Sequence, residues 1–180
     1  MTEMSEMAET TCYTTVASPL GDLLLTADAS GALTSLSVPG QTVRGRPKPD
    51  AVAAGVLGRP ATEPFRQARE QLAAYFAGEL TEFRLPLSSV GTAFREKVWA
   101  ALDSVPYGTT TTYGSLAARI GASRAAMRAV GGAVGANPLL IVRPCHRVIG
   151  ADGSLTGYAG GLDRKRHLLA LEHSLPPIPA

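Results

Sequence analysis

Short runs of apolar and β-branched residues mark the first part of the chain. Within residues 12–38 these runs are separated by turn-forming residues at 19–21 and 29–31, so we expect two or three β-strands. Residues 40–62 are rich in Pro and Gly and show no steady period, which predicts a long mobile loop. Apolar residues at helical spacing then predict a helix over 63–78.

Helical patterns dominate the second half. We expect one helix over 92–105 and two shorter helices over 115–121 and 124–136. Ser123 precedes the last of these and is expected to cap its free N–H groups. Two short helices joined by a tight Gly-containing turn are typical of a helix-turn-helix.

The end of the chain alternates between buried and glycine-rich segments. The apolar run 139–149 predicts a buried strand bent at Pro144. A Gly-rich loop follows at 157–163, and a final helix is expected over 164–175. No internal repeat is visible.

These elements predict an α+β protein with two domains. Residues 12–88 form a β-rich supporting domain, and residues 89–174 form a mostly helical domain. We expect the acidic start, residues 1–11, to be disordered and the end, residues 175–180, to be a flexible tail.

Composition narrows the class of protein. Hydrophobic residues make up 45% of the chain and charged residues 18%, which is typical of an ordinary globular protein. The start lacks the apolar segment of a signal peptide, and no run is long enough to span a membrane. With two cysteines, Cys12 and Cys145, and no export signal, we expect a cytoplasmic protein whose thiols are reduced.

The charge is divided unevenly between the two halves. Residues 1–90 hold 7 Lys and Arg against 10 Asp and Glu, a net −3, whereas residues 91–180 hold 10 against 5, a net +5. A basic half favours a polyanionic partner such as nucleic acid.

The second helix of the predicted helix-turn-helix is rich in small residues. Recognition helices usually carry long polar side chains that read the major groove. Here the small residues are Ala125, Ala126, Ala129, Gly131 and Gly132, and the cations are Arg124 and Arg128. Such a helix could enter the narrower minor groove, with Arg128 reaching the base stack or a phosphate. The alternative, that the small residues pack inside the protein, stays open from the pattern alone.

Cys145 is the candidate nucleophile. It stands between Pro144 and His146, and a thiol needs a nearby base or cation to react at neutral pH. Because neighbouring residues on a strand point to opposite faces, we expect His146 to act through a bridging water. Glu172 is the candidate carboxylate that orients the imidazole. The alternative is a buried, inert cysteine.

Together these motifs resemble the O6-alkylguanine-DNA alkyltransferase family. The resemblance rests on "PCHRV" at 144–148, "RAVGGAVGANP" before it and "TGYAGGLDRKRHLLALE" after it. It covers about residues 90–173 closely and the N-terminal part loosely. It implies an RNase H-like N-terminal domain and a C-terminal winged-helix domain. It also implies repair of duplex DNA by direct reversal, in which a flipped O6-alkylguanine loses its alkyl group irreversibly to Cys145. Whether O4-alkylthymine is a second substrate stays open from the sequence.

The resemblance also implies a role for each matching residue. In this resemblance Cys145 is the nucleophile, His146 is the base that acts through water, and Glu172 holds His146. Asn137 tethers the segment before the cysteine, and Tyr113 acts at the phosphate or at the leaving guanine. Contacts with the base fall to Val148, Tyr158, Ala159, Gly160 and, at O6, Lys165. Contacts with DNA fall to Arg128, which fills the gap left by the base, together with Arg124, Ala126, Ala129 and Gly131. The implied partner is double-stranded DNA, bound in the minor groove by a monomer that can cluster along it.

Two positions depart from the family pattern, and the zinc ligands of some relatives are missing. Arg143 stands where an aliphatic residue is usual, and Ala159 stands where some relatives have serine, so a contact there must come from the backbone. Some relatives bind zinc in the N-terminal domain through Cys and His, but here that domain has Cys12 and no His, so we expect no metal and no cofactor.

Three other classes of protein fit the sequence less well. A non-catalytic alkyltransferase-like binder of damaged DNA would replace the nucleophile, usually with Trp, whereas Cys145 is present. A redox sensor would need a resolving thiol, and Cys12 is in the other domain. A cysteine hydrolase would leave the DNA-reading helix unexplained.

Overall fold

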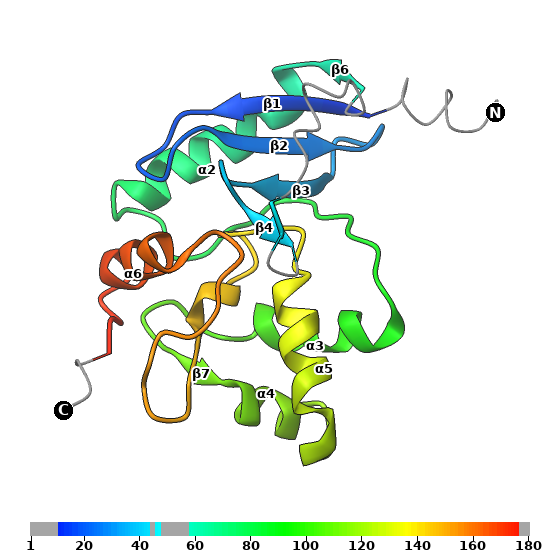
Figure 1. The fold of residues 1–180 in the computed structure, drawn as a ribbon. Helices are drawn as coiled ribbons and strands as arrows, with labels where there is room; N and C mark the ends of the chain where they lie inside the picture. The colour runs from blue at the N-terminus through cyan, green and yellow to red at the C-terminus, as the bar shows by residue number, and fades with distance from the viewer. Residues whose placement is uncertain (1–10, 44–45, 48–57, 177–180) are drawn as a thin grey trace.

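The computed structural model describes residues 11–43, 46–47 and 58–176. Strands gather at one end of the molecule and helices at the other, which confirms the expected α+β class (Figure 1). The predictions for the acidic start and the tail fall on residues outside the described ones, except at 11, 175 and 176. The same holds for most of the predicted loop 40–62.

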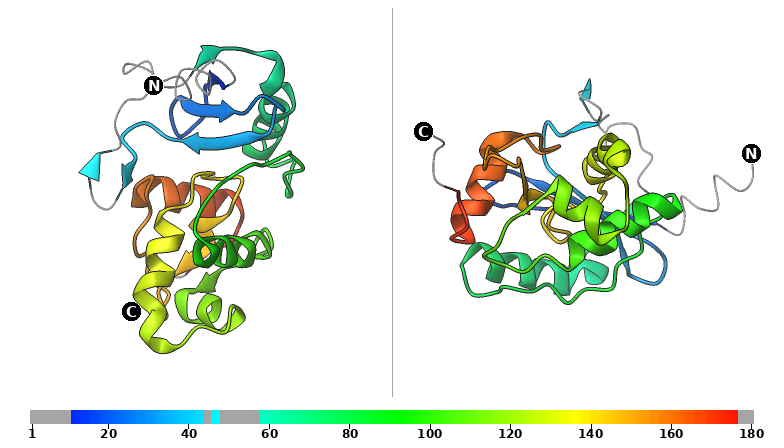
Figure 2. Two further views of the ribbon diagram at one scale, coloured as in Figure 1. Left: turned by 90° about the vertical axis from the view of Figure 1, so that its right-hand side faces the viewer. Right: turned by 90° about the horizontal axis from the view of Figure 1, so that it is seen from below.

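Three antiparallel strands form the centre of the N-terminal sheet. They are β1 (Cys12–Val16), β2 (Leu23–Ala27) and β3 (Leu33–Ser37), as expected for residues 12–38. Every second residue of β2 is buried, because alternate side chains of a strand face opposite sides of the sheet. The helix α2 (Arg66–Phe76) covers one face of this sheet (Figures 1 and 2).

The described ends of the predicted loop carry short strands. The strands β4 (Thr42–Val43) and β5 (Arg46–Pro47) pair as a hairpin, and β6 (Arg59–Pro60) joins the sheet parallel to β1. The loop prediction is therefore wrong at these positions. A strand of two residues is too short to leave a periodic signal in the sequence.

The C-terminal domain begins with the helix α3 (Ala93–Asp103), whose first turn is capped by the Thr92 side chain. The helix-turn-helix consists of α4 (Tyr113–Arg119) and α5 (Met127–Gly135). The helix α4 and the start of α5 lie at the end of the molecule farthest from the sheet, and α5 runs back toward the strands (Figure 1). Thr112 caps α4 through its side chain. The 3-10 turn η2 (Arg124–Ala126) precedes α5, and Ser123 makes no side-chain cap there, so that prediction is wrong.

Residues 139–149 do not form the predicted strand. Leu139 makes a single parallel bridge with Leu36, after which the chain turns through Ile141 at a φ of 71°. The 3-10 turn η3 (Cys145–Arg147) and the short strand β8 (Val148–Ile149) follow. β8 pairs with β7 (Thr111–Thr112) next to the helix-turn-helix. The apolar residues of 139–149 indicate burial but not a strand, because turns inside a core bury their side chains as strands do.

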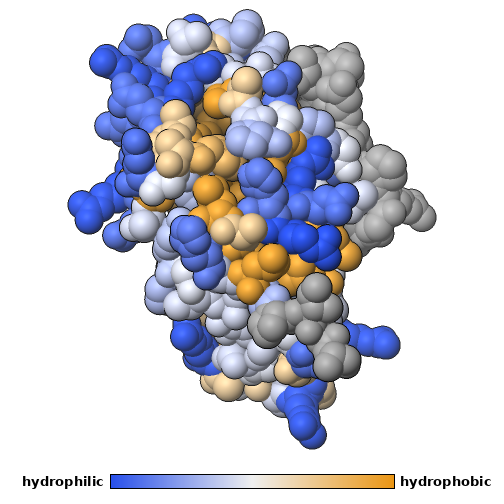
Figure 3. All heavy atoms as spheres, turned by 90° about the vertical axis from the view of Figure 1, so that its left-hand side faces the viewer, coloured by the Kyte–Doolittle hydropathy of each residue, from blue (hydrophilic) through white to orange (hydrophobic). Residues whose placement is uncertain are grey.

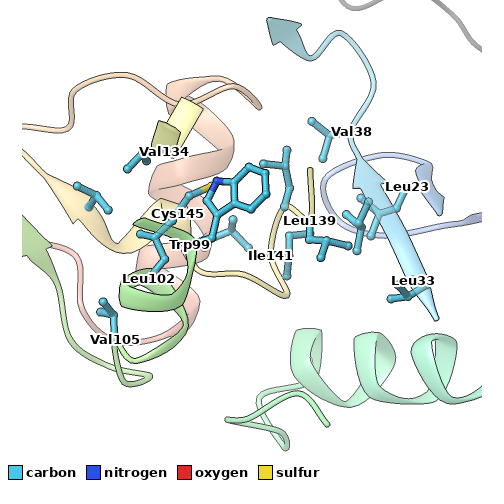
Figure 4. Packing of buried hydrophobic residues seen from close by; sticks show 14 of the residues in the cluster. Leu23, Leu33, Val38, Trp99, Leu102, Val105, Val134, Leu139, Ile141 and Cys145 are labelled. Carbon is cyan, nitrogen blue, oxygen red and sulfur yellow. The ribbon is translucent and has the colours of Figure 1, made fainter. Parts of the chain in front are cut away.

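One hydrophobic core joins the two domains. Figure 4 shows Leu139 between the sheet residues Leu23 and Leu33 on one side and a group around Trp99 and Cys145 on the other. The backbone agrees, since Leu36 N–H donates to the Pro138 carbonyl and Leu140 N–H donates to the Leu36 carbonyl. The segment that leads to the cysteine is thus attached directly to the N-terminal sheet.

The last helix, α6 (Leu162–Leu171), lies at the side of the molecule, next to both domains (Figures 1 and 2). On the face that carries it, hydrophobic side chains gather near the middle with hydrophilic ones around them (Figure 3). Among the described residues, every helix is too short or too polar to cross a membrane.

Candidate active site

Cys145 lies at the wall of a small cavity between the two domains. Its side chain is 4% exposed, and the cavity has a volume of about 170 Å³. The lining comes from β4, α4, α5, η3 and the loop before α6: Thr42, Tyr113, Gly131, Val134, Gly135, Cys145, Gly157, Tyr158 and Ala159. Of the predicted site residues, the structure places Tyr113, Gly131, Tyr158 and Ala159 around this thiol.

The thiol of Cys145 is held in its neutral form. Burial raises its pKa to about 11, although the Asn137 side chain and the positive charge of Lys165 act in the opposite direction. Reaction at neutral pH therefore needs a base that removes the thiol proton.

His146 and Glu172 form a buried pair behind the cysteine. His146 Nε2 lies 2.6 Å from Glu172 Oε2, and both side chains are fully buried. Burial raises the pKa of Glu172, but hydrogen bonds and charges from His146 and Arg147 outweigh it, so the net pKa is lowered and the carboxylate is ionised. Since a carboxylate only accepts, Nε2 carries the imidazole proton.

The other ring nitrogen of His146 is left free to act as a base. Nδ1 is buried and has no hydrogen-bond partner within the described part of the chain. Burial lowers the pKa of His146 from its ordinary value of 6.5, so the ring is neutral at pH 7 and Nδ1 carries a lone pair.

Arg147 supports the same carboxylate. Its Nε donates to Glu172 Oε1 at 2.6 Å, and its Nη1 donates to the Val105 carbonyl at 2.7 Å. Sequence reasoning missed this residue, because an arginine after "PCH" gives no indication of where it points.

Asn137 fixes the turn before the cysteine. Its Nδ2 donates to the carbonyls of Leu139 and Arg143, and its Oδ1 accepts from Leu139 N–H. This turn holds Ile141 in the left-handed region, which costs a β-branched residue about 1–3 kcal/mol of strain. The surrounding core and the amide of Asn137 compensate for that strain.

Arg143 points inward rather than toward solvent. Its Nε donates to Asp103 at 3.2 Å, its Nη1 donates to Ser89 at 3.2 Å, and its guanidinium lies 5.0 Å from the centroid of the Trp99 ring. Trp99 in turn donates to the Ala133 carbonyl of α5. The unusual arginine therefore ties the cysteine segment to α3 and, through Trp99, to the recognition helix.

Lys165 is buried in α6 and fully engaged, although the general expectation for a lysine on a helix is exposure. Its Nζ donates to the carbonyls of Val148, Thr156 and Gly157 at 2.5, 3.0 and 3.2 Å. Burial lowers its pKa to about 8. Because all three donors of Lys165 have acceptors, its geometry favours a role in holding the cavity wall over a direct contact with O6 of a guanine. Neither Lys165 nor Val148 lines the cavity.

Residues 157–159 line the same cavity as Cys145, and the residues on either side of them hold this segment in place. The Tyr113 hydroxyl donates to the Thr156 carbonyl, while the Tyr158 hydroxyl is buried without a partner among the described residues. The Ala159 carbonyl accepts from Thr42 N–H of the N-terminal domain. Gly160 allows the Tyr158 ring to fold back, because a Cβ at 160 would lie 2.7 Å from that ring.

The helix α5 leaves most of its small residues uncovered by other parts of the protein. Its buried face consists of Val130, Ala133 and Val134. Ala125 and Ala129 are exposed, and a Cβ built at Gly131, Gly132 or Gly135 would meet no atom within 4 Å. Internal packing, the alternative left open by the sequence, therefore does not account for these residues.

The predicted arginines lie on the same exposed part of the helix-turn-helix. Arg124 and Arg128 are exposed, and neither pairs with a carboxylate in the ranges that the structure covers. They are positioned, together with the open face of α5, for a negatively charged partner. No group of three or more His, Cys, Asp or Glu side chains that could hold a metal ion occurs among the described residues.

These features indicate a DNA-binding protein that carries its own nucleophile. Two family models match the chain: "6-O-methylguanine DNA methyltransferase, ribonuclease-like domain" over residues 11–89, and "6-O-methylguanine DNA methyltransferase, DNA binding domain" over residues 93–174. The chain belongs to the 6-O-methylguanine DNA methyltransferase family.

Individual relatives agree with the family models. The methylated-DNA–protein-cysteine methyltransferase of Mycolicibacterium paratuberculosis is 52% identical, covering 92% of this chain and 94% of the relative. The protein of that name from Methanosarcina acetivorans is 47% identical, covering 90% and 98%. The solved structure of Mycobacterium tuberculosis OGT in complex with DNA superimposes with a TM-score of 0.79 at 48% identity, covering 93% and 96%.

Proposed function

We propose that this protein repairs DNA by direct reversal, taking the alkyl group from the O6 atom of guanine onto Cys145. The bond from the Cys145 sulfur to the alkyl carbon forms as the bond from that carbon to O6 breaks. The thiol loses its proton, and the guanine leaves as an anion that takes up a proton and regains its normal form. The observation that carries the proposal is Cys145 in the cavity wall with the His146–Glu172 pair behind it.

His146 is the base of this reaction. Its free Nδ1 accepts the thiol proton through a bridging water, while Nε2 keeps its hydrogen bond to Glu172. As His146 becomes positively charged, the ionised carboxylate stabilises it. Tyr113 lines the same cavity with a hydroxyl able to supply a proton to the leaving guanine.

The DNA enters along α5. A helix with an open face of small residues can approach the floor of the minor groove, and Arg128 is long enough to occupy the space of a flipped base. Cavity, base and recognition helix all come from one chain, which supports a monomer. The basic C-terminal half supports electrostatic attraction to the DNA of a cytoplasmic nucleoid.

The reaction occurs once per molecule. The product is a thioether, which a second thiol does not reduce, and the remaining thiol, Cys12, is buried in β1 of the other domain. The protein is therefore consumed in stoichiometric amounts.

Mass spectrometry of the protein mixed with excess duplex containing one O6-methylguanine tests the proposal. We expect the intact mass to rise by one methylene group, on the Cys145 peptide, and then to stop. C145S should bind the duplex without gaining mass, and C12S, the matched control, should react like the wild type. Binding by the wild type without a mass change would instead identify a non-catalytic binder of damaged DNA.

A further inference from the structure

The catalytic carboxylate receives a hydrogen bond from the other domain. Tyr75, on α2 of the N-terminal domain, directs its hydroxyl at Glu172 Oε2 over 3.3 Å. The same oxygen pairs with His146 Nε2 at 2.6 Å. Arg147 Nε also donates to this oxygen, over 3.4 Å. Of the donors that meet on Oε2, Tyr75 alone comes from the other domain, and it lies 97 residues before Glu172 in the sequence.

Tyr75 has the properties of a residue held in place for this contact. Its side chain is 1% exposed, and its ring packs against those of Phe76, Phe83 and Tyr107 with centroids 5.3, 5.1 and 6.4 Å away. Burial, together with the charge of Glu172, raises the pKa of the Tyr75 phenol far above its usual value, so the hydroxyl stays protonated and donates.

We infer that Tyr75 is a positioning residue for alkyl transfer, through which the N-terminal domain holds Glu172 Oε2 and sets how strongly that oxygen attracts the proton of His146. The inference rests on the proposed function. An acceptor oxygen shared by two donors carries less negative charge toward each of them. Tyr75 thus makes His146 a weaker base, so that the imidazole stays neutral to a lower pH. A neutral imidazole can accept the proton of Cys145.

The charges around His146 allow this effect to be isolated. The groups that face it are Lys165 from α6, Glu172 at the C-cap of that helix, Arg147 from the same turn as His146, and Tyr75 from α2 through the carboxylate. Arg147 and Lys165 disfavour the imidazolium, and Glu172 favours it. Replacing Tyr75 by Phe leaves every one of these charges in place and removes one donor from Oε2.

The test is the pH profile of single-turnover methyl transfer from a duplex with one O6-methylguanine, for the wild type, Y75F and Y107F. In Y75F the imidazolium is better stabilised, so we expect the acid limb to move up by about half a pH unit. The rate on that limb should fall about threefold, and the difference should close on the plateau above it. Y107F is the matched control, since the Tyr107 hydroxyl donates to the Leu171 carbonyl rather than to the carboxylate. Its profile should follow the wild type.

Two results would overturn the inference. One is a Y75F profile identical to the wild type, and the other is a uniform loss at every pH, which a merely structural role produces. NMR titration of the His146 ring should show the same upward pKa change in Y75F, independently of DNA. Absence of methyl transfer by the wild type would contradict the proposed function instead.

Discussion

At the scale of single residues, the active site combines a protonated nucleophile with a neutral base. Many reactive cysteines are activated by a lowered pKa, whereas the pKa of Cys145 is raised to about 11 by burial. The pKa of His146 is lowered, also by burial first. The resting pair is therefore uncharged, so in the proposed reaction we expect proton removal to accompany attack on the alkyl group rather than to precede it.

Replacement of Lys165 by Met should destabilise the fold more than it changes the chemistry of the thiol. Three carbonyls, of Val148, Thr156 and Gly157, would lose their donor inside the protein. We expect a loss of about 3 kcal/mol in the free energy of unfolding, measured by urea denaturation. K97M, at an exposed lysine of α3, is the control and should change it by less than about 0.5 kcal/mol. Equal stability of the two variants would contradict the buried role of Lys165.

The sequence identified residues whose chemistry is local and missed those whose role depends on the fold. Cys145, His146 and Glu172 were found because a rare thiol, its neighbour and a lone acid in a basic stretch stand out. Tyr75 and Thr42 were not, since each reaches the site from the other domain, and an aromatic residue on an amphipathic helix looks like any core residue.

At the scale of elements, α5 carries glycines that weaken it as a helix. Gly132 is exposed and a Cβ there would meet nothing within 4 Å, so G132A should raise the free energy of unfolding by about 0.5–1 kcal/mol. G132L should also fold stably, but its side chain would keep the helix away from the groove floor. We expect a tenfold or greater loss of duplex affinity, of the order of 1.4 kcal/mol, in a fluorescence titration. Unchanged affinity in G132L would exclude this face of α5 from the DNA interface.

Elements were predicted well where a period repeats over several turns and poorly elsewhere. The helices α2 and α3 and the strands β1 to β3 match the expected ranges, because their apolar faces are long enough to show a period. The segment 139–149 was misassigned because its conformation is imposed by Asn137 and by a bridge to β3, both tertiary contacts. Ser123 stands at a helix start but does not cap it, since a 3-10 turn replaces the first α-turn.

At the scale of the whole molecule, the buried His146–Glu172 pair links folding to pH. The pKa of His146 is lowered from 6.5 and the net pKa of Glu172 is lowered from 4.5, so in acid the unfolded chain binds protons that the folded chain excludes. Stability must then fall as the pH drops through these values. We expect the free energy of unfolding to decrease by about 1–2 kcal/mol between about pH 7.5 and about pH 5, measured with urea.

A control separates this pair from the other histidines. H167Q changes an exposed histidine of α6 and should keep the same dependence on pH. A wild-type stability that does not vary over this range would show that His146 is protonated as readily in the folded protein as in the unfolded chain.

The burial of Cys145 also determines how long an unused molecule stays competent. A protein that reacts once must not spend its sulfur on peroxides or stray electrophiles while it waits, and such reagents attack the exposed thiolate form. Cys145 is 4% exposed and has a pKa of about 11, so these reagents meet little accessible surface and little thiolate. The same environment makes the thiol depend on His146 and protects the unreacted protein from inactivation. The thiol then reacts only when an alkylated guanine enters the cavity.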